Sequence, residues 1–172
     1  YINYYSSPLG KITLASNGNE LIGLWFEGQK YFGSTLNGEY KQKSLPVFEQ
    51  TAKWLDVYFS GKNPDFTPPL FLSSTSFRNE VWKILLTIPY GKIMTYGEIA
   101  KLMAENRGVE KMSAQSVGGA VGHNPISIIV PCHRVVGTDG SLTGYAGGVD
   151  IKEKLLKFEN VDMSKLFVPK SK

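Results

Sequence analysis

The densest group of potentially reactive side chains is the run Val130-Pro131-Cys132-His133-Arg134. Cys132 is the only cysteine of the chain, and a lone cysteine often packs as a small buried apolar residue. Here Pro131 can preset the first position of a helical turn. Cys132 would then lie where unpaired N–H groups favour the thiolate, which is the nucleophilic form. With His133 as a proton acceptor and Arg134 as a positive charge, the run predicts a reactive cysteine beside a base.

His133 needs a carboxylate to orient it as a base. Adjacent side chains do not face one another on a strand or a helix, so we expect a water molecule between His133 and Cys132. The acidic residues nearby in the sequence are Asp139, Asp150, Glu153 and Glu159. The residue pattern alone does not decide among these four.

Glycine is concentrated around the same run. Eight glycines lie within 31 residues: Gly118, Gly119, Gly122, Gly137, Gly140, Gly144, Gly147 and Gly148. They indicate tight turns, or a backbone that approaches a ligand closely. The segment 144–148 lacks the Lys and the strand-loop-helix order of a phosphate-binding loop. We interpret it as the rim of a pocket, with Tyr145 as a stacking face.

The elements that must position these residues fall into two regions. In the first region, strands are expected at Tyr1–Ser6, Gly10–Ser16 and Leu21–Phe26. Turn signals separate them, which is typical of an antiparallel meander. An amphipathic helix from Pro46 to Ser60 follows, and Gly61 ends it. The proline-rich stretch 63–76 is typical of an extended linker, so we place a domain boundary near residue 75.

The second region predicts a mostly helical domain. Helices are expected from Ser76 to Thr87, from Thr95 to Met103, from Ser113 to about Gly122 and from Asp150 to Phe158. The second and third of these resemble a helix-turn-helix. Ile126–Val130 has the pattern of a buried strand. Val135–Thr143, with Asp139-Gly140 at its turn, predicts a hairpin, which after a helix-turn-helix would form a wing.

Composition limits the classes of protein. The chain has 172 residues, of which 42% are hydrophobic and 20% charged, as in a folded globule and unlike a disordered, collagen-like or coiled-coil chain. It has no apolar run of about 18 residues that could span a membrane, and residues 1–10 carry no secretory signal. One cysteine allows no internal disulfide, and two histidines argue against a structural zinc site. We therefore expect a cytoplasmic protein.

The net charge of +4 lies entirely in the second region. Residues 1–74 hold six Lys and six acidic residues, whereas residues 75–172 hold thirteen Lys or Arg and nine acidic residues. A basic domain suits a polyanionic partner such as DNA, although an ordinary solvated surface has a similar charge. The helix at 113–122 offers few side chains that read base edges. It is either buried against its neighbours or approaches a shallow groove with little sequence reading.

The sequence around Cys132 resembles the O6-alkylguanine-DNA alkyltransferases, also called methylated-DNA–protein-cysteine methyltransferases. The resemblance is carried by Ile128–Val136, with support from Val117–Ala120, Asn124-Pro125, Gly144–Gly148 and Lys152–Glu159. It implies an α/β (α+β) fold with two domains. Residues 1–74 would form a ribonuclease H-like support domain with an antiparallel meander and a helix. Residues 75–172 would form a winged helix-turn-helix domain that binds DNA and carries the reactive cysteine.

The resemblance also implies an activity. Members of this family repair DNA by transferring an alkyl group from O6-alkylguanine to their own cysteine, irreversibly and once per molecule, after flipping the base out of the duplex. We expect O4-alkylthymine as a second substrate. No cofactor is implied, because the nucleophile is the acceptor. No metal is implied either, since the first-domain cysteines that bind zinc in some relatives are absent. The implied partner is double-stranded DNA with alkylated bases, bound by a monomer away from any membrane.

The family pattern assigns roles residue by residue. It makes Cys132 the nucleophile, His133 its base through a water molecule, and Glu159 the group that orients His133. Asn124 would hydrogen-bond to the backbone and connect the recognition helix, expected at 113–122, to the loop that carries Cys132. Tyr96 would rotate the 3′ phosphate of the target and help to protonate the leaving guanine. The substrate-binding set is Val135, Tyr145, Ala146 and Gly147. The DNA-binding set is Gln115, Ser116, Gly118, Gly119, Ala120 and Arg134.

Two residues depart from the family pattern, and three alternatives compete with it. Gln115 stands where the family often has the arginine that fills the gap left by the flipped base, and Ala146 stands where many relatives have Ser. An alkyltransferase-like protein that binds without reacting would lack Cys132. A winged-helix transcription regulator would need a recognition helix that reads bases. A cysteine hydrolase using Cys132 and His133 would turn over, whereas the alkyltransferase stops after one event.

Overall fold

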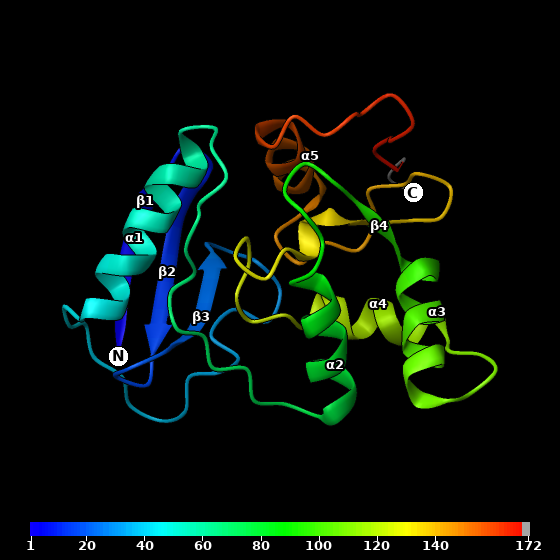
Figure 1. Cartoon of the computed structure of the whole chain (residues 1–172). Helices are drawn as coiled ribbons and strands as arrows, with labels where there is room; N and C mark the ends of the chain where they lie inside the picture. Colours follow the sequence, from blue (N-terminus) through cyan, green and yellow to red (C-terminus); the bar gives the residue numbers. More distant parts are fainter. Residues whose placement is uncertain (170–172) are drawn as a thin grey trace. The chain divides into compact units, whose positions relative to one another are not determined.

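The computed structural model describes residues 1–169, so the last three residues of the expected second domain lie outside the described chain. The chain divides into two compact units. One unit comprises residues 1–72 together with 125–129, and the other comprises residues 73–124 together with the chain from residue 130 onward. The first combines a sheet with one helix and the second is mostly helical (Figure 1).

The first unit is built on an antiparallel three-stranded sheet. Its strands β1 (Ile2–Ser7), β2 (Gly10–Ser16) and β3 (Leu21–Phe26) lie in the order β1-β2-β3. Ile12 of β2 is opposite Tyr5 of β1 and Phe26 of β3. The predicted meander is confirmed: β2 and β3 have the expected bounds, and β1 begins and ends one residue later than expected.

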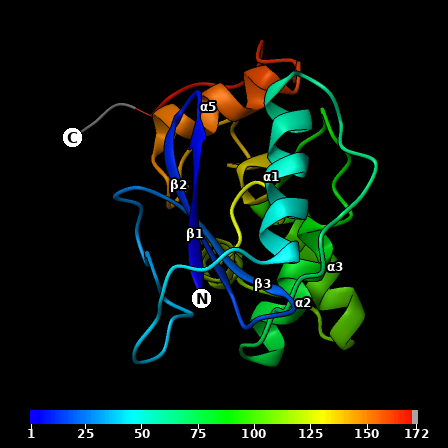
Figure 2. The ribbon, with the colours of Figure 1, turned by 90° about the vertical axis from the view of Figure 1, so that its left-hand side faces the viewer.

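Helix α1 (Pro46–Phe59) runs alongside the sheet (Figure 2). Pro46 suits the first turn of a helix, where its missing N–H would be unpaired in any case, and Glu49 adds an acid near the positive end of the helix dipole. The helix buries Val47, Phe48, Thr51, Trp54, Leu55 and Tyr58. Tyr5 of β1 donates a hydrogen bond to Asp56 of α1 at 2.6 Å, so the odd-numbered side chains of β1 face this helix.

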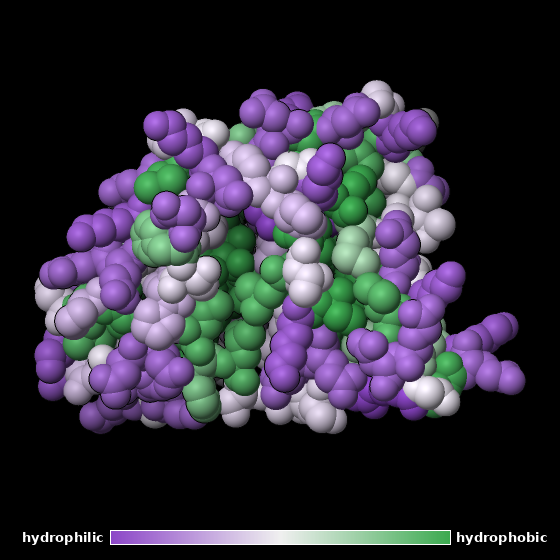
Figure 3. Space-filling view, in the orientation of Figure 1, coloured by the Kyte–Doolittle hydropathy of each residue, from purple (hydrophilic) through white to green (hydrophobic). Residues whose placement is uncertain are grey.

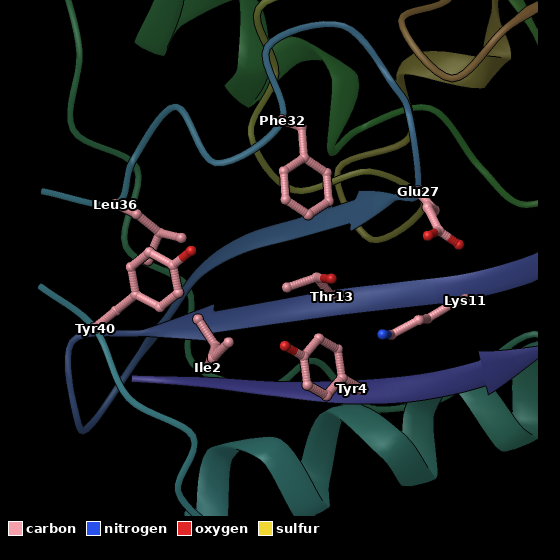
Figure 4. Close-up of a pocket in the computed structure, with 8 residues that line it drawn as sticks. All are labelled: Ile2, Tyr4, Lys11, Thr13, Glu27, Phe32, Leu36 and Tyr40. Carbon is pink, nitrogen blue, oxygen red and sulfur yellow. The ribbon is translucent and has the colours of Figure 1, made fainter.

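The other face of the sheet carries a shallow hollow. It has a volume of about 190 Å³ and is lined by Ile2, Tyr4, Lys11, Thr13, Glu27, Phe32, Leu36 and Tyr40 (Figure 4). The Lys11 ammonium lies 4.0 Å from the centre of the Tyr4 ring. Deeper on this face, Trp25 and Ala15 are fully buried, with Leu36 packed against them.

Residues 126–130 do not form the strand that their apolar pattern predicts. Ile126 makes one isolated bridge to Leu24 of β3, and the chain then turns, with the Ile129 N–H donating to the Ser127 carbonyl at 2.8 Å. Ile128 has a φ of 70°, outside the β region. All five residues are buried. The prediction was wrong because a short apolar run reports burial and does not distinguish a strand from a buried turn.

Three helices of the second unit pack together (Figure 1). They are α2 (Ser76–Leu85), α3 (Tyr96–Arg107) and α4 (Ala114–Gly122). Thr95 caps α3 in a capping box with Glu98, and Ser113 caps α4. Thr75 caps α2 by accepting a hydrogen bond from the Arg78 N–H. The α3–α4 pair is the predicted helix-turn-helix, and α3 continues four residues beyond its expected end, to an αL cap at Gly108.

The predicted hairpin after Cys132 does not form. Strand β5 (Val135–Val136) pairs in parallel with β4 (Met94–Thr95). The expected turn is present, because the Gly137 N–H donates to the Ser141 carbonyl at 2.8 Å. Beyond it, however, Ser141 bridges to Phe167 and not to β5. A later segment of the chain supplies this pairing, and a local pattern gives no sign of such a long-range partner.

The last helix is α5 (Val149–Phe158), one residue longer at its start than expected.

Hydrophilic side chains predominate at the margins of the face shown in Figure 3, with apolar side chains among them. Within residues 1–169, no helix is both long and apolar enough to cross a membrane.

Candidate active site

Cys132 begins a single 3₁₀ turn, Cys132–Arg134, in the second unit. The residue is buried, with 4% of its surface exposed. Burial raises the pKa of the Cys132 thiol, and this effect exceeds the lowering by the Asn124 amide, the Lys152 ammonium and nearby backbone N–H groups. The expected position at the start of a turn is confirmed, and backbone N–H groups lower the pKa of Cys132 as expected, but burial outweighs them. A turn of three residues has too small a dipole to offset desolvation of the sulfur.

His133 and Glu159 form a buried pair. Nε2 of His133 lies 2.5 Å from Oε2 of Glu159, and both side chains are shielded from solvent. A carboxylate only accepts hydrogen bonds, so Nε2 is the donor and Nδ1 is left as the basic nitrogen of the ring. Of the four acidic residues that the sequence left open, the structure brings Glu159 to His133.

The ionisation states of this pair suit a base and its orienting acid. Burial lowers the pKa of His133, although Glu159 acts in the opposite direction. Burial alone would raise the pKa of Glu159, but hydrogen bonds and charges of His133 and Arg134 bring it down to about 2. At neutral pH the pair is therefore a neutral imidazole beside a carboxylate.

Arg134 occupies the other oxygen of Glu159. Its Nε donates to Oε1 at 2.8 Å and its Nη1 donates to the Ile88 carbonyl at 2.7 Å. We predicted that Arg134 contacts DNA. Its side chain is 10% exposed and committed to these two internal acceptors, so the structure does not offer its guanidinium to a phosphate.

Asn124 follows directly after α4. It is buried, and its Nδ2 donates to the Val130 carbonyl at 2.8 Å. This bond joins the end of α4 to the segment that enters the 3₁₀ turn. The amide also lowers the pKa of Cys132.

Tyr96 and Lys152 converge on one backbone carbonyl. The Tyr96 hydroxyl, at the first residue of α3, donates to the Thr143 oxygen at 3.1 Å, and Nζ of Lys152 donates to the same oxygen at 3.0 Å. Burial, followed by the charge of Cys132, raises the pKa of Tyr96 to about 12, so its proton stays in place at neutral pH. A Cβ at Gly144 would lie 2.5 Å from the Tyr96 hydroxyl, so this close approach requires glycine.

The sequence matches one family in both of its parts. Residues 1–72 match the ribonuclease-like domain of 6-O-methylguanine DNA methyltransferase, and residues 76–161 match the DNA-binding domain of the same protein. The methylated-DNA–protein-cysteine methyltransferase of Haemophilus influenzae is 39% identical over 162 residues, which is 94% of this chain and 87% of that protein. Its counterpart in Methanosarcina barkeri is 44% identical over 160 residues, 92% of this chain and 96% of that protein.

A solved structure agrees with these relatives. Mycobacterium tuberculosis OGT in complex with DNA has a TM-score of 0.78 and 40% identity, covering 96% of this chain and 94% of that one. The chain belongs to the methylated-DNA–protein-cysteine methyltransferase family. The expected resemblance, the mixed α/β fold class and the assignment to DNA repair by alkyl transfer to a cysteine are thereby confirmed for this chain as a family member.

Helix α4 divides the predicted DNA-binding residues of this methyltransferase into two groups. Gln115, Ser116 and Gly119 are exposed and Gly118 is half-buried. Ala120 is 3% exposed, and its carbonyl accepts a hydrogen bond from Nε1 of Trp82 at 2.8 Å. Ala120 therefore packs on the inner face of α4 and is not available to DNA, because it lies on the opposite side of the helix from Gln115.

The predicted substrate-binding residues lie on two segments. Val135 is buried in β5, Tyr145 is 8% exposed, and Ala146 and Gly147 are half-buried in the loop before α5. A Cβ at Gly147 would lie 2.5 Å from the Tyr145 ring, so glycine at this position leaves room for the ring close to the backbone.

Lys152 is the site residue that the sequence reasoning missed. It is fully buried on α5, and burial lowers its pKa to about 8, an effect that Cys132 partly opposes. A signal was present in the spacing, because Lys152 precedes Leu155 and Leu156 by three and four residues and so shares their inward face. No group of three or more His, Cys, Asp or Glu residues that could hold a metal ion occurs in residues 1–169.

Proposed function

We propose that this methyltransferase repairs double-stranded DNA by moving an alkyl group from O6-alkylguanine to Sγ of its own Cys132, once per molecule. O4-alkylthymine is included as a second substrate. The observation that carries the proposal is the buried Cys132 next in the chain to a His133–Glu159 pair, in a chain of this family. The acceptor is the protein itself, so the reaction needs no cofactor.

The first step is removal of the thiol proton. Because burial raises the pKa of Cys132, the resting sulfur is a thiol and needs a base. Nδ1 of His133 takes the proton through a water molecule, and Glu159 stabilises the imidazolium that results. The Lys152 ammonium offsets the negative charge that develops on the sulfur.

The second step is the displacement itself. Sγ attacks the alkyl carbon, the S–C bond forms, and the C–O6 bond breaks with its electron pair moving into the guanine ring. Tyr96 supplies a proton to the leaving base, since its raised pKa keeps the hydroxyl protonated and ready as a donor. Tyr96 then regains a proton through solvent, which balances the one that His133 took from the thiol. In net terms the alkyl group moves from O6 to sulfur and one proton moves from the protein to guanine.

DNA is held on the exposed side of α4 in this proposal. Gln115, Ser116, Gly118 and Gly119 lie against the duplex, and Gln115 fills the space left by the flipped base. Once extruded, the base enters a pocket formed by Val135, Tyr145, Ala146 and Gly147.

Three further expectations belong to the proposal. The chain acts as a monomer, it works in the cytoplasm, and its two regions divide the work. Residues 1–74 support the fold, and residues 75–172 bind DNA and accept the alkyl group. The charge difference between the regions supports this division, since the net charge of +4 lies in residues 75–172.

The test uses Cys132→Ala. A duplex with one O6-methylguanine is mixed with either protein, and loss of the methyl group from DNA is followed together with DNA binding. Wild type should demethylate one equivalent of duplex, whereas Cys132→Ala should bind the duplex and remove none. Methyl removal by Cys132→Ala would overturn the proposal. Failure of wild type to remove the methyl group while still binding would favour a non-reacting binding protein.

A further inference from the structure

Arg134 occupies a place beside the His133–Glu159 pair for which the chemistry above gives no role. Its guanidinium is held from three sides. It donates to Oε1 of Glu159 and to the Ile88 carbonyl, and it lies 5.8 Å from the centre of the Tyr90 ring. Arginine suits this position, because its rigid fork can satisfy two fixed acceptors at once.

The carboxylate of Glu159 has a separate partner on each oxygen. Oε1 accepts from Arg134 and from the Gly91 N–H at 3.2 Å, while Oε2 accepts from His133. With Oε1 held, the carboxylate cannot rotate away from the imidazole without breaking two hydrogen bonds. Glu159 lies just after the end of α5, where side-chain contacts, and not a helix interior, must fix its direction.

Charge gives Arg134 a second effect. A carboxylate as buried as Glu159 tends to take up a proton, because desolvation disfavours the anion. Arg134 opposes this and also disfavours a positive charge on His133. Tyr90 and Lys152 are further ionisable groups near the pair. Of these, Lys152 donates to the Thr143 carbonyl at 3.0 Å.

We propose that Arg134 is a positioning residue of the alkyl transfer: it keeps Glu159 an oriented carboxylate and His133 a neutral base with its proton on Nε2. This inference rests on the proposed function, because it assigns Arg134 a role in activating Cys132. Without the guanidinium the His133–Glu159 pair takes up a further proton at a higher pH than in wild type. His133 is then an imidazolium and cannot accept the thiol proton.

The experiment measures the pH dependence of single-turnover methyl transfer at saturating duplex. We expect Arg134→Gln to move the acidic limb of the rate profile upward by about one pH unit, which lowers the rate about tenfold at pH values below the limb and restores it at higher pH. Arg134→Lys keeps the positive charge, so its limb should stay near that of wild type even if the rate is lower. The control is Arg107→Gln, which removes an exposed pair with Glu80 in the same unit and should leave the limb in place.

A purely structural role for Arg134 has a different signature. It would lower stability, or the rate by the same factor at every pH, without moving the limb, and that result would overturn the inference. If Arg134→Gln does not fold, an NMR titration of the His133 ring decides. The ring should be neutral with the proton on Nε2 in wild type and Arg134→Lys at pH 7, and an imidazolium or an Nδ1–H form in wild type would contradict the inference. Absence of methyl transfer by wild type would instead refute the proposed function.

Discussion

The two units of this methyltransferase bury different kinds of polar side chain. The first buries only uncharged ones: Thr13, Ser16, Gln29, Thr51 and Ser127. Several of these bond to backbone close by, as when Thr51 donates to the Val47 carbonyl one helical turn earlier at 2.7 Å. The second unit buries Asn124, His133, Arg134, Ser141, Lys152 and Glu159, so all four buried ionic or basic side chains among the described residues lie there.

This difference separates polar groups that serve folding from polar groups that serve chemistry. A buried hydroxyl bonded to a local carbonyl costs little and contributes about 1 kcal/mol. Buried charges cost several kcal/mol each unless they are paired, and replacing them by apolar residues often stabilises a protein. Three such charges, on Arg134, Lys152 and Glu159, lie with the neutral His133 close to the Cys132 turn in the chain or in space. They are therefore best explained by the reaction. The comparison predicts distinct outcomes for substitutions in the two units.

The largest effect is expected for Glu159→Gln. The amide cannot hold His133 as a base, so single-turnover transfer should slow about 100-fold or more, within the usual range for general base catalysis. Arg134 loses its buried partner, so the free energy of unfolding should fall by about 3–5 kcal/mol. The matched control is Glu153→Gln on α5, whose ion pair with Lys157 is at the surface and should contribute under about 1 kcal/mol. Equal kinetics for the two variants would remove Glu159 from the mechanism.

Lys152→Met should separate activity from stability. Burial lowers the pKa of Lys152 from 10.5 to about 8, so the folded state disfavours its ammonium form. Lys152 therefore makes the free energy of unfolding increase only as pH rises from about 8 to 10.5. Below pH 8 the substitution removes that penalty and should raise the free energy of unfolding by a few kcal/mol, on the order of 1.4 kcal/mol for each pKa unit. Transfer should slow, because the developing thiolate loses the cation that lowers its pKa.

The control for this substitution is Lys154→Met, which changes an exposed lysine two residues away on the same helix. It should alter neither thermal unfolding nor transfer by a measurable amount. A Lys152→Met variant that is less stable than wild type would show that the buried ammonium stabilises the fold. In that case the contrast between the two units would not hold.

Acid should affect the second unit through Glu159. Its pKa is about 2 in the folded state and 4.5 as the reference value. The stability it contributes is therefore fully present above pH 4.5 and is lost as pH falls toward 2, by about 3 kcal/mol in all. The free energy of unfolding of wild type and of Glu159→Gln, measured with denaturant between pH 6 and pH 3, should be plotted against pH. The two curves should converge at low pH. Curves that stay parallel would mean that Glu159 is not ionised in the fold.

The smallest effect is expected for Thr51→Val in the first unit. Thr51 is fully buried on α1 and its hydroxyl bonds one turn back along the helix. Loss of that bond should lower the free energy of unfolding by about 1 kcal/mol and leave the transfer rate unchanged. A slowed transfer in a variant of normal stability would contradict the assignment of this unit to support.

The sequence predicted local elements better than contacts between distant segments. Caps such as Thr95 and Ser113 act within one turn of chain, so α3 and α4 begin where their residues predict. The prediction of a hairpin after Cys132 was wrong because Ser141 pairs with Phe167, 26 residues further along the chain, and not with Val135–Val136. The residue pattern likewise left four acids for His133, and the family resemblance selected Glu159, which the structure brings to it.

Burial explains the remaining differences between sequence and structure. A sequence motif shows that Cys132, His133 and Arg134 are consecutive in the chain, but it does not show which of them are exposed to solvent. Desolvation reverses the expected ionisation of Cys132, and the same enclosure turns Arg134 from a predicted DNA contact into a partner of Glu159. Lys152 was overlooked because a lysine on an amphipathic helix is usually placed at the surface.

The most direct test of the central claim is the intact mass of the protein after mixing with duplex DNA that holds one O6-methylguanine. We expect a gain of one methylene per molecule, located on the peptide that contains Cys132, which stops at one equivalent however much duplex is added. An unchanged mass with the duplex still bound, or continued turnover without a modified cysteine, would contradict it.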